Sequence, residues 1–305
     1  MLSCVACVAC LAAAGAQTRK SRAKNVAKQT AKAKPANGTE VKTVTSSKKA
    51  QLPNDTIVVN GVAFEMVHVA GGTFTMGLLP KRDGDPADDN PITKFQFYAP
   101  AHRVTLSDYC IGKTEVTQAL WNAVMGESNS DLTDTNDYLT SMGEMPIKAG
   151  ENLPKNYVSW GQCQKFIEKL NALTGKKFRF PTEAEWEYAA RGGNKSKGYK
   201  FSGSNDINEV AWYYANSGKE LHPVGTKAPN ELGIYDMTGN VKEWCADLRG
   251  DYNLKPQTNP LCTEDNSRVV RGGYWGAMSV FCRTTVRAGE YSDYCTSNVG
   301  LRLAY

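Results

Sequence analysis

The segment from Asn230 to Trp244, which reads NELGIYDMTGNVKEW, constrains the fold more than any other part of this chain. Its glycines and asparagines interrupt the periodicity that a helix or a long strand needs. The whole chain after Gly192 is similarly dense in Gly, Asn and aromatic residues, which indicates loops and short strands. In so irregular a domain, we expect the large aromatic rings to supply most of the buried surface.

Regular elements are predicted mainly before Gly192. Strand patterns occupy residues 56–59 and 62–69, and Asn60-Gly61 between them is a strong hairpin signal. Two further short strands are expected at 73–76 and 103–106.

Three helices are predicted in the same half of the chain. One covers residues 117–125. The second begins with a capping box at Ser159 and runs to about Leu173, and the third begins with another at Thr182 and runs to Ala190. There is no internal repeat. The patterns together predict one α+β domain over residues 53–305, low in regular secondary structure.

The net charge of +5 is unevenly distributed. Residues 18–50 hold ten Lys or Arg and one acidic residue, Glu40, which leaves 26 basic and 30 acidic side chains in residues 51–305. A nucleic-acid partner would need the basic residues on the folded face, so we expect none. Residues 17–52 contain too few large apolar side chains to offset their ordering entropy, which predicts a basic disordered linker. This linker could attract anionic lipid or polysaccharide at a membrane surface.

Residues 2–16 form an apolar run without charge, and Ala14-Gly15-Ala16 fits a small-x-small cleavage site. We therefore expect residues 1–16 to be a signal peptide and the protein to be exported, either periplasmic, outer-membrane-associated or extracellular. The run is too short to span a membrane. Two alternatives stay open: a hydrophobic tail without an export role, and lipidation at Cys7 or Cys10, each of which follows a small residue.

Six cysteines remain outside this leader, and an even number in an exported protein favours disulfides. The sequence does not decide how they pair. No Cys-x-x-Cys occurs among them, which argues against a zinc ribbon or a thioredoxin-type site. The six are Cys110, Cys163, Cys245, Cys262, Cys282 and Cys295.

A series of short motifs follows one after another along residues 56–305. In order, they are FTMG at 74–77, PAHRVTL at 100–106, KTEVT at 113–117, VSW at 158–160, RFPTEAEWEYAARGG at 179–193, GIYDMTGNVKEW at 233–244, RGG at 271–273 and NVGLRL at 298–303. In these motifs the chain resembles the formylglycine-generating enzyme family, also called sulfatase-modifying factors. The resemblance implies a single α+β domain with a C-type-lectin-like core.

The motif that ends at Trp244 carries a candidate calcium site. The carboxylates of Asp236 and Glu243 stand seven residues apart around a glycine turn, and Ca²⁺ prefers several carboxylate and carbonyl oxygens. The resemblance implies that these two side chains and the carbonyls of Gly239 and Val241 bind calcium.

The redox centre of the family is incomplete in this chain. Catalytic members of the family that this chain resembles carry two cysteines, three and eight positions after the residue that follows Arg-Gly-Gly. In this chain that residue is Tyr274. These positions are Ala277 and Cys282. In the family the thiolate pair binds Cu(I) and activates O₂ to convert a substrate cysteine into formylglycine. Soft thiolates suit Cu(I), and Ala277 supplies none. We therefore do not expect copper, and Cys282 is the one candidate catalytic residue if the protein is active.

Two interpretations of the other cysteines follow. Cys295, in the loop before Asn298, could replace the missing thiol. The plainer interpretation is that Cys282 and Cys295 pair with Cys245 and Cys262 in some combination, with Cys245–Cys282 favoured. The three histidines (His68, His102 and His222) are widely separated and are expected to be structural or surface residues.

Three functions are compatible with these patterns. The first, which we favour, is a non-oxidase binding or scaffold protein of the cell envelope that recognises a protein, peptide or glycan through surface loops. The second is a formylglycine-generating oxidase with a shifted second thiol. The third is a different enzyme that uses Cys282 alone or a new site.

Overall fold

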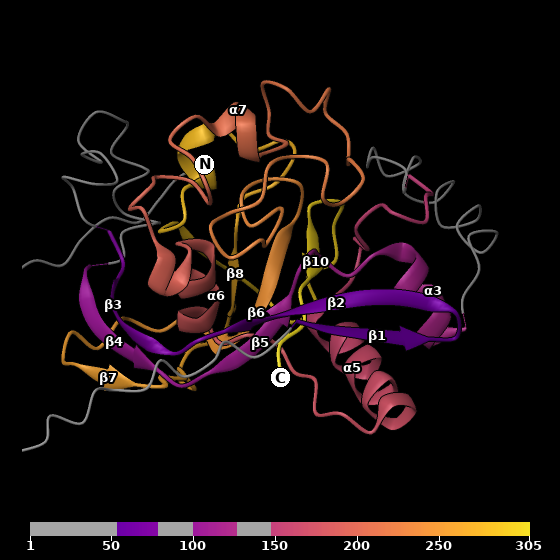
Figure 1. The fold of residues 1–305 in the computed structure, drawn as a ribbon, viewed down its shortest axis with the longest axis horizontal. Coiled ribbons are helices and arrows are strands. Elements are labelled where there is room, and N and C mark those ends of the chain that lie inside the picture. The colour runs from indigo at the N-terminus through magenta and orange to yellow at the C-terminus, as the bar shows by residue number, and fades with distance from the viewer. Residues whose placement is uncertain (1–53, 79–99, 127–147) are drawn as a thin grey trace, which may run out of the picture. The chain divides into compact units, whose positions relative to one another are not determined.

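The computed structural model describes residues 54–78, 100–126 and 148–305 (Figure 1). The predicted signal peptide (1–16), its candidate lipidation sites Cys7 and Cys10, and the whole of the predicted linker (17–52) lie outside the described residues. In the described ranges, no helix is both long enough and apolar enough to cross a membrane.

A hairpin opens the domain as the sequence predicts. Strands β1 (Asp55–Val59) and β2 (Val62–Val69) are antiparallel, with Val59 opposite Val62, and β2 pairs in turn with β5 (Tyr109–Gly112). Asn60 and Gly61 form the two-residue turn, with φ angles of 48° and 84°. Positive φ at both positions is the requirement of a type I′ turn, which explains why Asn-Gly stands there.

Two more sheets complete the strands of the described residues. In one, β4 (His102–Leu106) pairs with β3 (Gly72–Met76) and β7 (Gln257–Thr258). The other has the order β10-β6-β8-β9 and is formed by β6 (Lys242–Leu248), β8 (Arg268–Arg271), β9 (Arg287–Glu290) and β10 (Val299–Leu301). This last sheet brings the Asp236–Glu243 loop, the Arg-Gly-Gly motif and the C-terminal motif side by side.

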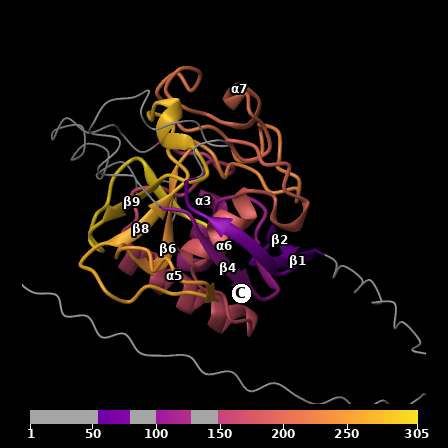
Figure 2. The same cartoon turned by 90° about the vertical axis from the view of Figure 1, so that its left-hand side faces the viewer.

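The three predicted helices are formed, and one short helix, α7 (Ile207–Val210), lies after Gly192, where the sequence predicted only loops and short strands. The three are α3 (Gln118–Met125), α5 (Trp160–Thr174) and α6 (Glu183–Ala190), with 3₁₀ turns η3 (Gly193–Lys195) and η4 (Ser279–Cys282). The capping boxes at Ser159 and Thr182 are both formed. Helices α3 and α5 pack together beside the β1–β2 hairpin, whereas α6 lies near β3 and β6 (Figure 1). Strands β6, β8 and β9 lie next to one another in the view of Figure 2.

Large rings fill the core, as so irregular a domain requires. Trp121 stacks on Phe166 with 4.9 Å between ring centroids, and Trp186 and Trp244 are fully buried. The Trp244 indole N–H donates to the carbonyl of Val158 at 3.0 Å, so the buried ring keeps a polar partner. The fold class is confirmed as α+β with few helices and much irregular structure.

The expected disulfides are not formed. All six cysteines of the domain are free. Cys245 is buried on β6 in the apolar cluster around Trp186, whereas Cys282 is buried in a different cluster with Ala277 and Phe201. The expected Cys245–Cys282 pair is therefore wrong, because an even number of cysteines says nothing about which core each side chain enters.

Candidate functional site

The two positions of the family's redox centre lie together in the structure. Strand β8 ends at Arg271, and Gly272 and Gly273 turn the chain with φ angles of 98° and 75°. The segment that follows brings Ala277 and Cys282 into one small apolar cluster. Ala277 is 4% exposed and Cys282 is 0% exposed. The spacing therefore places both positions correctly, but they contribute one thiol.

The chemistry of the Cys282 thiol follows from its burial. A side-chain carbon added at Gly273 would lie 2.5 Å from the Cys282 sulfur, so the thiol packs directly on the glycine backbone. Burial raises the pKa of Cys282 to about 12, and the backbone N–H of Tyr274 opposes this only in part. Because the thiolate is the nucleophile and the metal ligand, this thiol is a poor candidate for both roles at neutral pH.

A surface cavity of about 370 Å³ lies beside this cluster. Its apolar wall includes Ala277, Met278 and Phe281. At one side Lys242 forms an ion pair with Glu290 at 2.5 Å and lies over the ring of Tyr274, 5.7 Å from its centroid. Such a mostly apolar cavity with a few polar groups is suited to an extended peptide or a small ligand. Cys282 is not part of its lining.

Exposed apolar side chains continue beyond this cavity. Met278 and Tyr214 are 56% and 57% exposed, and the Tyr214 backbone N–H donates to the carbonyl of Ala277 at 3.0 Å. The two residues therefore extend the apolar surface on that side.

The structure places Cys295 elsewhere. It is an exposed residue, and the desolvation of its thiol raises the pKa, which Lys155 opposes only in part. It lies near Cys163 of α5. The loop around it is held to the start of α5 by the Trp160 N–H, which donates to the carbonyl of Ser292 at 3.1 Å. Cys295 is not a member of the cluster that contains Ala277 and Cys282.

The predicted calcium residues form a tight buried loop. Asp236 and Gly239 have φ angles of 58° and 83°, and a side-chain carbon at Gly239 would lie 2.2 Å from the carbonyl oxygen of Trp212. Asp236 accepts a hydrogen bond from the Gly225 N–H at 2.7 Å. Burial, more than any other cause, raises the pKa of Asp236 to about 6.

Glu243, the other predicted side-chain ligand, already has protein partners. Its carboxylate accepts Arg302 Nη2 at 2.6 Å and Nε at 2.8 Å, and the Trp186 indole N–H at 2.7 Å. In the described part of the chain, no group of three or more His, Cys, Asp or Glu side chains is arranged to hold a metal ion. A calcium ion at the predicted position would have to share Glu243 with Arg302.

A third buried carboxylate, which the sequence did not single out, lies next to these two. Glu115 accepts the Asn240 amide at 2.8 Å and the Val241 N–H at 3.1 Å. Its pKa is raised well above the usual range, first by burial and then by Asp236. Glu115, Asp236 and Glu243 thus lie around the guanidinium of Arg302, so buried carboxylates outnumber the buried cation that they face.

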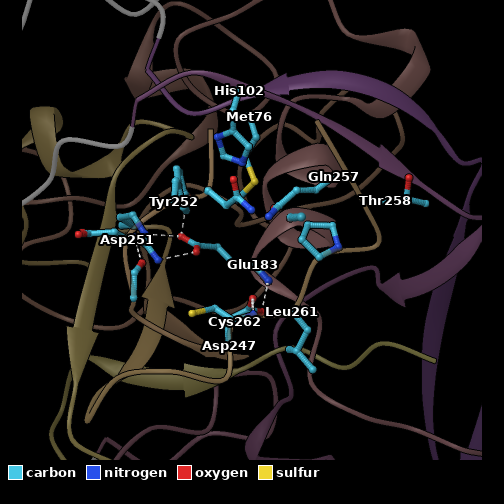
Figure 3. A pocket seen from close by; sticks show the side chains of 15 residues that line it. Met76, His102, Glu183, Asp247, Asp251, Tyr252, Gln257, Thr258, Leu261 and Cys262 are labelled. Atoms are coloured by element: carbon cyan, nitrogen blue, oxygen red, sulfur yellow. Dashed lines mark hydrogen bonds and ion pairs between the residues drawn. The ribbon is translucent and has the colours of Figure 1, made fainter. Parts of the chain in front are cut away.

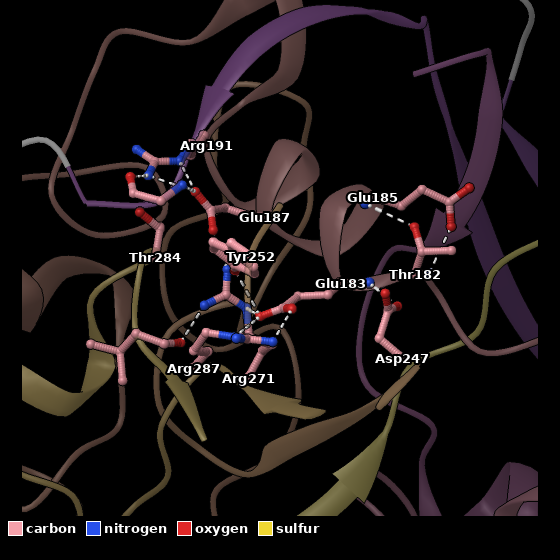
Figure 4. Close-up of polar contacts among 12 residues, drawn as sticks. Thr182, Glu183, Glu185, Glu187, Arg191, Asp247, Tyr252, Arg271, Thr284 and Arg287 are labelled. Atoms are coloured by element: carbon pink, nitrogen blue, oxygen red, sulfur yellow. Dashed lines mark hydrogen bonds and ion pairs between the residues drawn. The ribbon is translucent and has the colours of Figure 1, made fainter. Parts of the chain in front are cut away.

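The sequence also missed a buried ladder of charges beside α6 (Figure 4). Every residue of this helix is buried, including its three glutamates, so each carboxylate must find a partner. Glu183 pairs with Arg287 through two hydrogen bonds of 2.8 Å, and Glu187 pairs with Arg191 and Arg271. The alternating Glu residues of the RFPTEAEWEYAARGG motif could have predicted these ion pairs. Charged residues on every side of a helix that is buried need partners on every side.

These features define a class of protein: a loop-rich α+β domain with one buried thiol beside a surface cavity. The chain belongs to the sulfatase-modifying factor family, because the family model described as "Sulfatase-modifying factor enzyme 1-like domain" matches residues 54–305.

Individual relatives carry names with different activities. The chain is 34% identical to "Chaperone protein LppX" of Paenibacillus barcinonensis over 56% of this chain and 71% of that protein. It is 27% identical to "Formylglycine-generating enzyme" of Streptomyces coelicolor over 78% of this chain and 88% of that protein. It is 32% identical to "Inactive C-alpha-formylglycine-generating enzyme 2" of Bos taurus over 80% and 89%.

A solved structure is similar over most of the chain. "Treponema denticola variable protein 1" superimposes with a TM-score of 0.66 and 31% identity, over 82% of this chain and 98% of that one. The expected family and fold are confirmed.

Proposed function

We propose that this protein is a non-oxidase member of the family, a binding or scaffold component exported to the cell envelope. The observation that carries this proposal is the pair Ala277 and Cys282: a methyl group stands where the family has a thiol, and the remaining thiol is buried and protonated. A Cu(I) site with two thiolates is not available from the aligned positions.

The names of the relatives support a non-oxidase role. A chaperone and an inactive enzyme are among proteins at least 32% identical to this chain. Fold alone does not assign function, so these names support the proposal only together with the residue at position 277. The apolar, uncharged run at residues 2–16 supports an envelope location.

The cavity lined by Ala277, Met278 and Phe281 is the proposed recognition surface. An apolar wall, the ring of Tyr274 and one ion pair can hold an extended peptide or the face of a sugar ring. The partner we propose is accordingly a protein, peptide or glycan of the envelope, and not a nucleic acid.

A binding experiment tests this surface. A Met278→Glu variant puts a charge on the exposed, apolar side of the cavity and changes no buried residue. We expect partners cross-linked to the wild-type protein in envelope preparations to be lost in Met278→Glu and kept in Leu173→Glu, which changes an equally exposed leucine of α5. Equal cross-linking by all three proteins would contradict the proposed surface.

The second candidate function, a formylglycine-generating oxidase, is tested separately. The reduced protein is incubated with Cu(I), O₂ and a Cys-x-Pro-x-Arg peptide, and the peptide is analysed by mass spectrometry. The proposal predicts an unchanged cysteine. Replacement of the cysteine sulfur by an aldehyde oxygen would support the oxidase.

We also propose structural calcium at the loop of Asp236, Gly239, Val241 and Glu243. Support comes from the excess of buried carboxylates around Arg302. In this role calcium would neutralise buried charge and hold the loop, because a hard cation is bound by carboxylate and carbonyl oxygens.

A further inference from the structure

A second cavity, of about 420 Å³, lies at the first turn of α6 and shares no lining residue with the cavity beside Ala277 (Figure 3). Segments far apart in the sequence form its walls. Met76 and His102 come from β3 and β4, Glu183 from α6, and Asp247 from β6.

Most of the charge in this cavity is already balanced. Arg287 donates Nε and Nη2 to the two oxygens of Glu183, both at 2.8 Å, and the Tyr252 hydroxyl donates to Glu183 at 2.9 Å. The guanidinium and the carboxylate therefore neutralise each other, and this pair leaves no net charge in the wall.

Asp247 is different, because it has hydrogen bonds but no direct ion pair, and the guanidiniums of Arg287 and Arg268 act on it only from a longer distance. Its carboxylate accepts the Glu183 N–H at 2.7 Å and the Cys262 N–H at 2.9 Å, and the residue is 4% exposed. Among the described residues, Asp247 takes part in no ion pair. A buried carboxylate in this situation favours a cation that can enter from the cavity.

The rest of the lining suits an organic cation better than a hydrated metal ion. The Arg287 guanidinium carbon lies 4.2 Å from the centroid of the Tyr252 ring, and the centroids of the His102 and Tyr252 rings are 4.6 Å apart. Aromatic faces stabilise cations of this kind. Met76 and Leu261 supply apolar surface on which an aliphatic stem can pack.

We infer that this cavity binds an ammonium or guanidinium group carried on a short aliphatic stem, with Asp247 as its counter-ion. This site is distinct from the proposed partner surface, and it does not depend on whether the protein is an oxidase.

The ionisation of Asp247 makes the inference testable by pH. Burial, followed by the nearby charge of Glu183, raises the pKa of Asp247 to about 7. The other charged or titratable groups that line the cavity are Arg287, Asp251, His102, Tyr252 and Cys262, and Arg268 of β8 acts on Asp247 from outside the cavity. Since a cation binds the ionised carboxylate, affinity is expected to rise about tenfold from pH 6 to pH 8.

The first experiment measures binding to the whole folded protein by ligand-observed NMR. The probes are butylammonium and butylguanidinium, with 1-butanol as an uncharged analogue of the same length. We expect saturable binding of at least one cation and none of 1-butanol. A blocked lysine, N-acetyl-lysine methylamide, distinguishes a peptide side chain from a free amine: whichever binds more tightly names the source. No saturable binding of any cation would overturn the inference.

Variants locate the site. Asp247→Asn should weaken cation binding at least tenfold at pH 8 and remove its dependence on pH, whereas a dependence retained in this variant would overturn the assignment of Asp247 as the counter-ion. Leu261→Trp, which changes a 51% exposed residue and leaves the buried groups intact, should block the cavity and cause a similar loss. Glu168→Gln, an exposed residue of α5 that lines neither cavity, should have no effect. Equal binding by wild type, Asp247→Asn and Leu261→Trp would overturn the inference.

Discussion

Replacing Glu187 by Gln tests the idea that the charge ladder beside α6 holds the domain together. Glu187 is 0% exposed, and one of its oxygens accepts Arg191 Nη2 at 2.6 Å, Arg191 Nε at 2.8 Å and the Gly77 N–H at 2.8 Å. The other oxygen accepts from Arg271. Glutamine keeps the shape but has one acceptor oxygen and no charge, so the ion pairs of Glu187 with Arg191 and Arg271 are both lost, and Arg271 keeps only the longer contact of its Nε with Glu183, at 3.6 Å.

The expected cost is large because the partners are buried. Arg191 and Arg271 have side-chain exposures of 5% and 0%. Breaking a buried pair from one side costs about 3–5 kcal/mol of unfolding free energy. In a domain of this size, that corresponds to a fall in Tm of roughly 10 °C. Urea unfolding followed by tryptophan fluorescence measures the difference in free energy directly.

Glu185→Gln is the matched control on the same helix. Glu185 pairs with Arg179, whose side chain is 43% exposed, and a glutamine can still complete the capping box of Thr182. Water can therefore solvate Arg179, and the expected cost is about 1 kcal/mol or less. An equal cost for Glu185→Gln and Glu187→Gln would refute the reasoning, because burial would then not decide the effect.

The pH dependence of the same pair of proteins adds an independent check. Burial alone would raise the pKa of Glu187, but Arg191 and Arg271 outweigh it and hold the pKa below its usual value. A lowered carboxyl pKa gives stability that is present above the unfolded-state pKa and is lost as the pH falls through the folded-state pKa. The stability difference between wild type and Glu187→Gln should therefore shrink from pH 7 towards pH 3.

Three further predictions concern other buried groups. The folded-state pKa of Asp247 is about 7, above its value in the unfolded chain. Ionisation of Asp247 should therefore lower the unfolding free energy of the wild type by up to about 4 kcal/mol as the pH rises from about 4 to 7. In Asp247→Asn the fall in Tm over the same pH range should be smaller. If calcium binds at Asp236 and Glu243, chelation should lower the Tm of the wild type but not of Asp236→Asn, and an unchanged wild-type Tm would count against calcium. Gly239→Ala should lose at least about 2 kcal/mol by urea unfolding, since its φ is 83° and the new carbon would meet a backbone oxygen at 2.2 Å; a neutral effect would show that the loop can move.

Local signals in the sequence predicted local structure well. The turn at Asn60-Gly61 and the capping boxes at Ser159 and Thr182 depend on residues within four positions of each other, so the pattern alone contains the geometry. The position of Ala277 beside Cys282 was predicted through the family resemblance, which aligns both positions with the cysteine pair of catalytic members.

Contacts between distant residues were not predictable in the same way. Glu187 and Arg271 are 84 positions apart, and Glu243 and Arg302 are 59 positions apart, so their pairing is decided by how the sheets and α6 assemble. The prediction of a Cys245–Cys282 disulfide was wrong for the same reason. An even number of cysteines does not say in which apolar cluster each side chain is buried. The cavity at Asp247 is lined by residues of β3, β4, α6 and β6, so no single segment of the sequence predicts it.

The central claim is that this member of the family has no copper–dithiolate site, and Cu(I) binding measures it most directly. The reduced wild-type protein and Ala277→Cys are titrated against a chromophoric Cu(I) chelator. We expect that the wild type does not compete for Cu(I), because Cys282 is a single buried thiol with a pKa of about 12, and that Ala277→Cys competes more strongly by placing a second thiol beside it. Tight binding of one Cu(I) by the wild type, lost in Cys282→Ser, would contradict the account.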